Sequence, residues 1–221
     1  MTVGIFAESA ELVRIGATIG LMRMFFSFEH SERHSEKLGY SDFEVRSRDA
    51  MPDVTKIMIV AHPDDESLFG GETLTSSEGW LVICVTNASN ETRRAEFIRA
   101  MCLAGADYLM LDHADHFTSG NFDPALAAKL ARVLAEIPSE IVVTHGATGE
   151  YGHRQHRALH RIVRRLVPTE RLFTFATRWL ARPHISAAKQ RLLDCYVSQD
   201  SIERFRYMSE REFLRPSRPI S

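Results

Sequence analysis

The chain has 221 residues, of which 44% are hydrophobic and 25% are charged, and its formal net charge is -2. These values are typical of one globular domain with a sizeable core, and they exclude a chain that is mainly disordered. No apolar run approaches the roughly 18–20 residues of a membrane-spanning helix, so we expect no transmembrane segment.

The charge is distributed unevenly along the chain. Residues 51–150 hold 6 basic and 15 acidic side chains, whereas residues 153–191 hold 10 basic and 1 acidic side chain. Such asymmetry can indicate an anionic partner, but the two segments can also neutralise each other in the fold, which we favour. With a pI near 6.6, we expect no binding to nucleic acid.

Three cysteines, Cys84, Cys102 and Cys195, are widely spaced and odd in number. This pattern argues against a disulfide framework and favours a reducing compartment, most simply the cytoplasm. The first charged residues are Glu8 and Glu11, whereas a secretory signal begins with basic residues. We therefore expect no secretion.

Residues 1–50 differ from the rest of the chain. Apolar residues recur at partial helical spacing over residues 10–28, and the polar residues 29–50 predict a loop or a short helix. We interpret residues 1–50 as an N-terminal extension, partly helical, and residues 51–221 as the main domain.

From Lys56 onward, apolar β-branched runs alternate with helical patterns. The predicted strands are residues 57–61, 80–86, 108–111, 141–144 and 172–176. The predicted helices are residues 66–74, 91–104, 124–137 and 154–167, and most of 186–207. Asp123 is expected to cap the start of the third helix and Gly105 the end of the second. The alternation predicts an α/β fold, with a Rossmann-like, mainly parallel sheet and helices on both faces.

Two polar clusters follow predicted strands, where open α/β sheets bind ligands. The first is His62-Pro63-Asp64-Asp65-Glu66, directly after the first strand. Pro63 indicates a tight turn that lets His62 and Asp65 point at one centre, and one imidazole with one carboxylate suits zinc. Asp64 lies between them and is expected to accept a proton from a metal-bound water.

The second cluster extends from His145 to His156, after the fourth strand. His153 and His156 are three residues apart at the start of a helix and share one face. Either can complete a His-Asp-His site with an open position, which catalytic zinc requires. His145 is expected to support this site without binding metal.

Each pattern also has a structural explanation. Surface helices often carry His-x-x-His, and acidic residues favour helix N-termini. Taken alone, each explanation is the more common one. Because both clusters lie at the carboxyl ends of strands, a functional site is the better interpretation of the two together.

The first cluster, with the apolar strand before it and Gly70-Gly71 after it, resembles the PIG-L/LmbE family of zinc-dependent N-acetylglucosaminyl deacetylases. The second cluster, Arg93-x-x-Glu96 and Tyr196-x-Ser198-Gln199 are similar to further motifs of that family. The resemblance covers roughly residues 56–200.

The resemblance implies a role for each matching residue. His62, Asp65 and His156 would bind Zn²⁺. Asp64 would be the general base, and His153 would stabilise the oxyanion or protonate the leaving amine. Arg93 would bind the substrate.

One position departs from the family pattern. The second motif of the family usually reads His-Pro-Asp-His, whereas this chain has His153-Arg154-Gln155-His156. A neighbouring carboxylate orients a histidine and raises its pKa. With the neutral Gln155 in that place, we expect His153 to deprotonate at lower pH than in relatives with aspartate.

The sequence thus predicts a metal-dependent N-deacetylase that hydrolyses a small-molecule N-acetylated amino sugar or glycoconjugate. Two alternatives are an acyl-amide hydrolase acting on a glycosylated natural product and a non-catalytic sugar-binding α/β module. A nucleotide-binding Rossmann protein is disfavoured, because no G-x-G-x-x-G follows the first strand. A homo-oligomer is compatible with the sequence. The sequence does not identify the acceptor sugar.

Overall fold

The computed structural model describes residues 44–45, 54–115, 123–179, 185–205 and 208–210. The helix expected within residues 10–28 lies outside these ranges. Among the described residues, no helix is both long enough and apolar enough to cross a membrane.

Six strands form the main sheet, in the spatial order β1-β4-β3-β2-β5-β6. They are β1 (Glu44–Val45), β2 (Lys56–Val60), β3 (Trp80–Thr86), β4 (Asp107–His113), β5 (Ile141–Thr144) and β6 (Leu172–Thr174). Strands β2 to β6 pair in parallel, and β1 pairs antiparallel with β4 at the edge. This confirms the mainly parallel α/β sheet, in which the five parallel strands follow the Rossmann order 3-2-1-4-5.

Within the described residues, six helices accompany the sheet. They are α2 (Asp65–Ser76), α3 (Glu91–Ala104), α4 (Pro124–Glu136), α5 (Arg154–Leu166), α6 (Ala187–Leu193) and α7 (Asp200–Phe205). The expected caps are confirmed: the side chain of Asp123 accepts from the backbone N–H groups of Ala125 and Leu126, and Gly105 ends α3 in the left-handed conformation.

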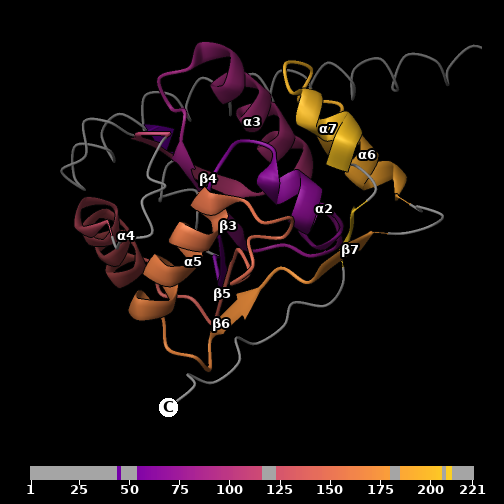
Figure 1. The fold of residues 1–221 in the computed structure, drawn as a ribbon. Helices are drawn as coiled ribbons and strands as arrows, with labels where there is room; N and C mark the ends of the chain where they lie inside the picture. The colour runs from indigo at the N-terminus through magenta and orange to yellow at the C-terminus, as the bar shows by residue number, and fades with distance from the viewer. Residues whose placement is uncertain (1–43, 46–53, 116–122, 180–184, 206–207, 211–221) are drawn as a thin grey trace, which may run out of the picture.

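The helices cover both faces of the sheet (Figure 1). On one face, α4 and α5 pack on alternate strand residues such as Ile57 and Ile83. On the other face, α2, α3, α6 and α7 pack on the intervening residues, such as Met58 and Val82. Because side chains alternate along a strand, a parallel sheet covered on both sides needs such continuous apolar strands.

Two predicted segments differ from the structure, and one pair of strands was not predicted. The polar pattern of residues 29–50 predicts a loop or short helix, but Glu44–Val45 form a strand that pairs with β4. The helical pattern of residues 186–207 corresponds to two short helices, α6 and α7. Strands β7 (Thr177–Trp179) and β8 (Met208–Glu210) form a separate antiparallel pair that the sequence pattern does not predict. Strands of two or three residues are too short to show a periodic pattern, and pairing with a distant segment defines them.

The sheet order places the two polar clusters together. β2 lies between β3 and β5 in the sheet. Strands β3 and β4 lie on one side of β2, and β5 and β6 lie on the other, so the order of the strands reverses between β2 and β5. The loops that follow these two strands face the same crevice, where doubly wound sheets bind ligands.

Candidate active site

The loop after β2 brings His62 and Asp65 into contact. The backbone N–H of His62 donates to Asp65 Oδ2 at 2.8 Å, and His62 Nδ1 lies 3.2 Å from the same oxygen. The side chain of Asp65 is only 3% exposed. The expected i, i+3 convergence across the Pro63 turn is therefore confirmed.

Asp64 occupies the N-cap position of α2 in an unusual conformation. Its φ of 127° is rare for a residue other than glycine, and such strain costs about 1–3 kcal/mol. The Asp64 carboxylate is buried but makes no capping hydrogen bond to α2. The backbone N–H of Asp64 donates to Glu66 Oε2 at 3.2 Å, so Glu66 braces this turn.

The loop after β5 depends on Gly149 and Glu150, which have φ values of 70° and 54°. A Cβ atom on Gly149 would lie 2.5 Å from the carbonyl oxygen of His153. Only glycine fits there without a backbone shift. This tight turn directs the carboxylate of Glu150 toward the side chains of His145 and His156.

Glu150 lies between His145 and His156. Its Oε2 accepts from Nδ1 of His145 at 2.9 Å and from Nδ1 of His156 at 2.7 Å, and its Oε1 accepts from the Gly146 N–H at 2.7 Å. Burial opposes the charge of Glu150, but the two histidines lower its pKa to about 2. The carboxylate therefore acts as an acceptor. This role of Glu150 was not predicted from the sequence, in which the only signal is an acidic residue within the loop before His153.

These hydrogen bonds determine which ring nitrogens carry protons. In the neutral ring of His156, the donation of Nδ1 to Glu150 leaves the lone pair on Nε2. That Nε2 is buried without a hydrogen-bond partner and lies 3.2 Å from Asp65 Oδ1. In His145, by contrast, Nε2 accepts the Ala61 N–H at 3.0 Å while Nδ1 donates to Glu150. The same Nε2 of His145 also lies 3.5 Å from Asp65 Oδ2, and His145 belongs with Asp65 and His156 to a group that could hold a metal ion. The expectation that His145 supports the site without binding metal stays a prediction.

Two imidazole nitrogens converge on the carboxylate of Asp65, namely Nδ1 of His62 and Nε2 of His156. With both rings neutral, the lone pairs of these nitrogens would face an ionised carboxylate, an arrangement that a cation between them stabilises. One oxygen and two nitrogen donors fit a divalent metal such as zinc. Two groups of side chains have ligand atoms within 4.8 Å of one another, namely His62, His153 and His156, and Asp65, His145 and His156. His156 belongs to both groups, whereas His62 and Asp65 belong to one each, so the predicted set of His62, Asp65 and His156 stays a prediction.

His153 lies at the start of α5, beside this centre. Its ring centroid is 5.0 Å from that of His62 and 4.3 Å from that of His156. A ring nitrogen of His153 also lies within 4.8 Å of ligand atoms of both residues, so this geometry alone does not exclude His153 as a ligand. Burial, together with the neighbouring His156 and His62, lowers the pKa of His153 to about 4. Gln155 is not among these causes, and the expected difference from relatives with aspartate stays a prediction.

Tyr151 forms an aromatic wall of the site that sequence analysis missed. Its ring centroid lies 5.6 Å from those of both His153 and His156. On its other side, Tyr151 stacks on Phe205 of α7 at 4.2 Å. The residue is 40% exposed, so it borders the site on the solvent side.

Arg93, expected to contact substrate, holds the loop of Asp64. Its Nη2 donates to the Pro63 carbonyl at 2.8 Å and lies 3.8 Å from Asp64 Oδ2. The side chain is 18% exposed. The structure thus shows Arg93 next to the candidate base, where it stabilises the loop.

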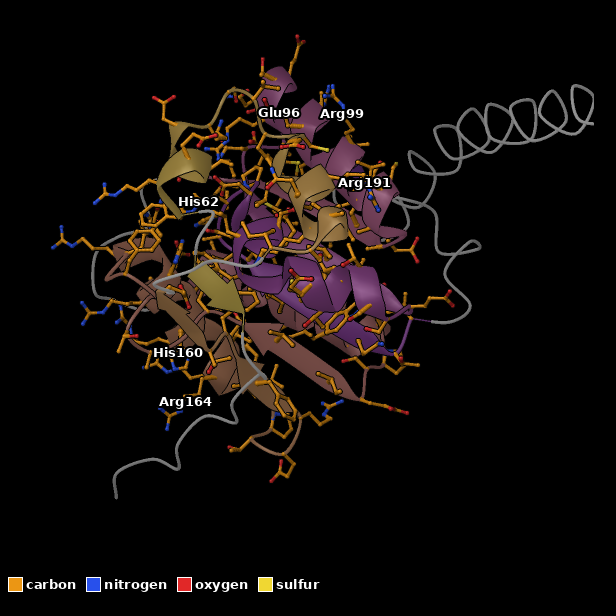
Figure 2. The ribbon with its side chains drawn as sticks, turned by 90° about the vertical axis from the view of Figure 1, so that its right-hand side faces the viewer. His62, Glu96, Arg99, His160, Arg164 and Arg191 are labelled. Carbon is orange, nitrogen blue, oxygen red and sulfur yellow. The ribbon has the colours of Figure 1, made fainter. Side chains whose placement is uncertain are left out.

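The late Tyr196-x-Ser198-Gln199 motif forms hydrogen bonds with residues of two earlier motifs. The Ser198 N–H and Oγ donate to the two carboxylate oxygens of Glu96, at 2.8 and 2.7 Å. The Tyr196 hydroxyl donates to Glu66. Figure 2 shows Glu96 and Arg99 on α3 with Arg191 on α6, on the opposite side of the view from His160 and Arg164 on α5, with His62 between these groups.

Comparison with known proteins agrees with this geometry. The family model PIG-L, described as GlcNAc-PI de-N-acetylase, matches residues 57–167. An uncharacterized protein of Acanthamoeba polyphaga mimivirus is 31% identical over 185 residues, which span 76% of this chain and 82% of that protein. The 1D-myo-inositol 2-acetamido-2-deoxy-alpha-D-glucopyranoside deacetylase of Salinispora arenicola (strain CNS-205) is 26% identical over 179 residues, 60% of this chain and 58% of that protein.

The fold is also found among solved structures. A conserved protein from Thermus thermophilus superposes with a TM-score of 0.56 and 20% sequence identity, over 76% of this chain and 99% of that chain. A likeness at this level of identity shows a shared fold.

Proposed function

From the premise that the chain belongs to the PIG-L family, described as GlcNAc-PI de-N-acetylase, we propose that it is a zinc-dependent N-deacetylase. Its substrate would be a small-molecule N-acetylated amino sugar or sugar conjugate. The Salinispora relative, whose name specifies an acetamido sugar and a deacetylase activity, supports this class of substrate.

The observation that carries the proposal is the convergence of His62 and His156 on Asp65. Nδ1 of His62 and Nε2 of His156 each lie 3.2 Å from an oxygen of Asp65. These three side chains would hold the metal. Zinc bound there would supply Lewis-acid activation of a water molecule and of the amide carbonyl.

Asp64 would act as the general base. It is adjacent to Asp65, is buried, and does not cap α2. Its carboxylate would take a proton from the attacking water, and the leaving nitrogen needs one proton as the C–N bond breaks. One water and one amide thus give acetate and a free amine.

His153 and Arg93 would complete the site. His153 lies beside both proposed histidine ligands, where a ring N–H can donate a hydrogen bond to the developing oxyanion. Arg93 approaches Asp64 from α3 with a partly exposed side chain. We propose that it also contacts the substrate at the edge of the site.

The described cysteines Cys84, Cys102 and Cys195 are unpaired, which supports the expectation of a reducing compartment such as the cytoplasm.

Acetate release tests the function. The zinc-loaded chain would be incubated with a panel of N-acetylglucosamine conjugates, and acetate and free amine would be quantified. We expect equal amounts of both products, and release slower by about 10²–10⁴-fold from the Asp64→Asn variant. Sugar binding without acetate release, unchanged by Asp64→Asn, would instead identify a non-catalytic sugar-binding module.

A further inference from the structure

The imidazole of His62 has two partners on the side away from Asp65. Its Nε2 lies 2.6 Å from Gln155 Oε1 and 3.2 Å from Asp115 Oδ1. The amide of Gln155 donates from Nε2 to the same Asp115 oxygen at 2.8 Å. Asp115 follows β4 and Gln155 lies in the first turn of α5, so three separate segments meet here.

The donors and acceptors of this cluster can be assigned. A carboxylate only accepts hydrogen bonds, so the NH₂ group of Gln155 must face Asp115 and its oxygen must face His62. Both groups at Nε2 of His62 are then acceptors, and Nε2 carries a proton. In the neutral ring this leaves the lone pair on Nδ1, the nitrogen that faces Asp65.

The negative charge behind His62 comes from Asp115. Gln155 is neutral, so by itself it orients the ring without adding charge. The side chain of Asp115 is 47% exposed, so its charge is retained at a small desolvation cost. An anionic partner behind a metal-binding histidine fixes its tautomer and raises its basicity.

We propose that Asp115 is a positioning residue for the metal site, which acts through Gln155 to hold His62 with Nδ1 directed at the metal. The inference rests on the metal site proposed above. Asp115 provides the carboxylate that position 155 of the HRQH motif lacks.

Metal affinity measures this role directly, because it does not depend on turnover. The zinc dissociation constant of the full chain would be determined by competition with a chelator, together with the absorption spectrum of bound Co²⁺. Asp115→Asn should weaken zinc binding by about 10–100-fold, as loss of a group that orients a ligand typically does.

Asp112→Asn is the matched control. Asp112 lies three residues earlier, and its carboxylate accepts from the N–H and hydroxyl of Ser89 instead of contacting His62. The Asp112→Asn substitution removes the same charge as Asp115→Asn. It should nevertheless leave the zinc affinity within about twofold of that of the original chain, because the charge of an exposed carboxylate that does not contact His62 is screened.

A double variant tests the pathway through Gln155. The combination of Asp115→Asn and Gln155→Glu exchanges the two groups, so that the carboxylate is at position 155, next to His62, and the amide is at position 115. The amide at position 115 can then donate a hydrogen bond to the carboxylate at position 155. Zinc affinity and the Co²⁺ spectrum should return to within about threefold of the original, because the anionic partner of the ring is restored.

Three results would overturn the inference while leaving the proposed function intact. They are full zinc affinity in Asp115→Asn, an equal loss in Asp112→Asn, and failure of the double variant to recover although it unfolds at the original temperature. An original chain that binds no zinc would overturn both the inference and the proposed function.

Discussion

The hydroxyl of Tyr196 donates a hydrogen bond to the carboxylate of Glu66, although the two residues are 130 positions apart. Glu66 is fully buried, accepts from the Ser67 hydroxyl at 2.6 Å, and accepts the backbone N–H of Asp64. Tyr196 therefore positions Glu66, and Glu66 in turn stabilises the strained turn at Asp64. The C-terminal part of the chain supports the candidate catalytic loop without lying in it.

Replacing Tyr196 with phenylalanine tests this support. The ring still fills the core, but a buried carboxylate loses a donor, which costs about 1–3 kcal/mol of stability. We expect a lower kcat with zinc content unchanged, because Asp64 loses its fixed position while the ligands remain. Tyr108→Phe, which changes a buried tyrosine packed on Phe97, is the control. Unchanged kcat in Tyr196→Phe would contradict the positioning of Asp64 by this bond.

The chain should contain about one zinc ion when purified, because catalytic zinc sites use three protein ligands and an open position. Removing the metal with a chelator should abolish acetate release, and zinc or cobalt should restore it. Elemental analysis and the acetate assay measure both effects. Full activity in a preparation verified to be metal-free would disprove the proposed chemistry.

The adjacent aspartates should respond differently to the same substitution. Asp64→Asn removes the base but no ligand, so turnover should fall by about 10²–10⁴-fold while zinc is retained. Asp65→Asn removes a ligand and should deplete zinc, as should His156→Ala. Metal content and kcat are measured on the same samples. Loss of zinc from Asp64→Asn would show that the roles of the two aspartates are assigned wrongly.

Glu150→Gln should weaken zinc binding by about 10–100-fold. The Oε2 atom of Glu150 accepts from both His145 and His156, and an amide cannot present a carboxylate's charge to both rings. His156 then loses the partner that keeps its lone pair on Nε2. Glu140→Gln, an exposed acidic residue, is the control. Unchanged chelator competition in Glu150→Gln would show that the tautomer of His156 is held in another way.

A chain that starts at Met51 should still bind zinc, because every proposed ligand follows that residue. It lacks β1, however, and thereby exposes the edge of β4. An unprotected strand edge promotes association between chains, so we expect lower solubility than for a chain that starts at Gly39 and keeps β1. Size-exclusion chromatography and zinc titration measure both properties. A folded Met51 chain without zinc affinity would show that the first 50 residues contribute to the site.

Local features of the sequence determined most of the secondary structure. The bounds predicted for β3, α3 and β5 agree with the structure, because continuous apolar runs and capping residues act within a few positions of the chain. The convergence of His62 and Asp65 was predictable for the same reason: three residues across a proline turn leave little conformational freedom.

Contacts between distant segments were decided by the tertiary structure. Asp115 and Tyr196 contact the site or its supporting residues from segments that the fold brings together, and their sequence neighbourhoods indicate neither contact. The interpretation that Gln155 leaves the motif without a carboxylate considered only adjacent residues, whereas Asp115 approaches from 40 positions away. Local spacing determined which chemical groups the chain carries at the ends of β2 and β5. Because a ring tautomer depends on the partners that packing places beside it, only the folded chain decided which nitrogen atoms face the metal site.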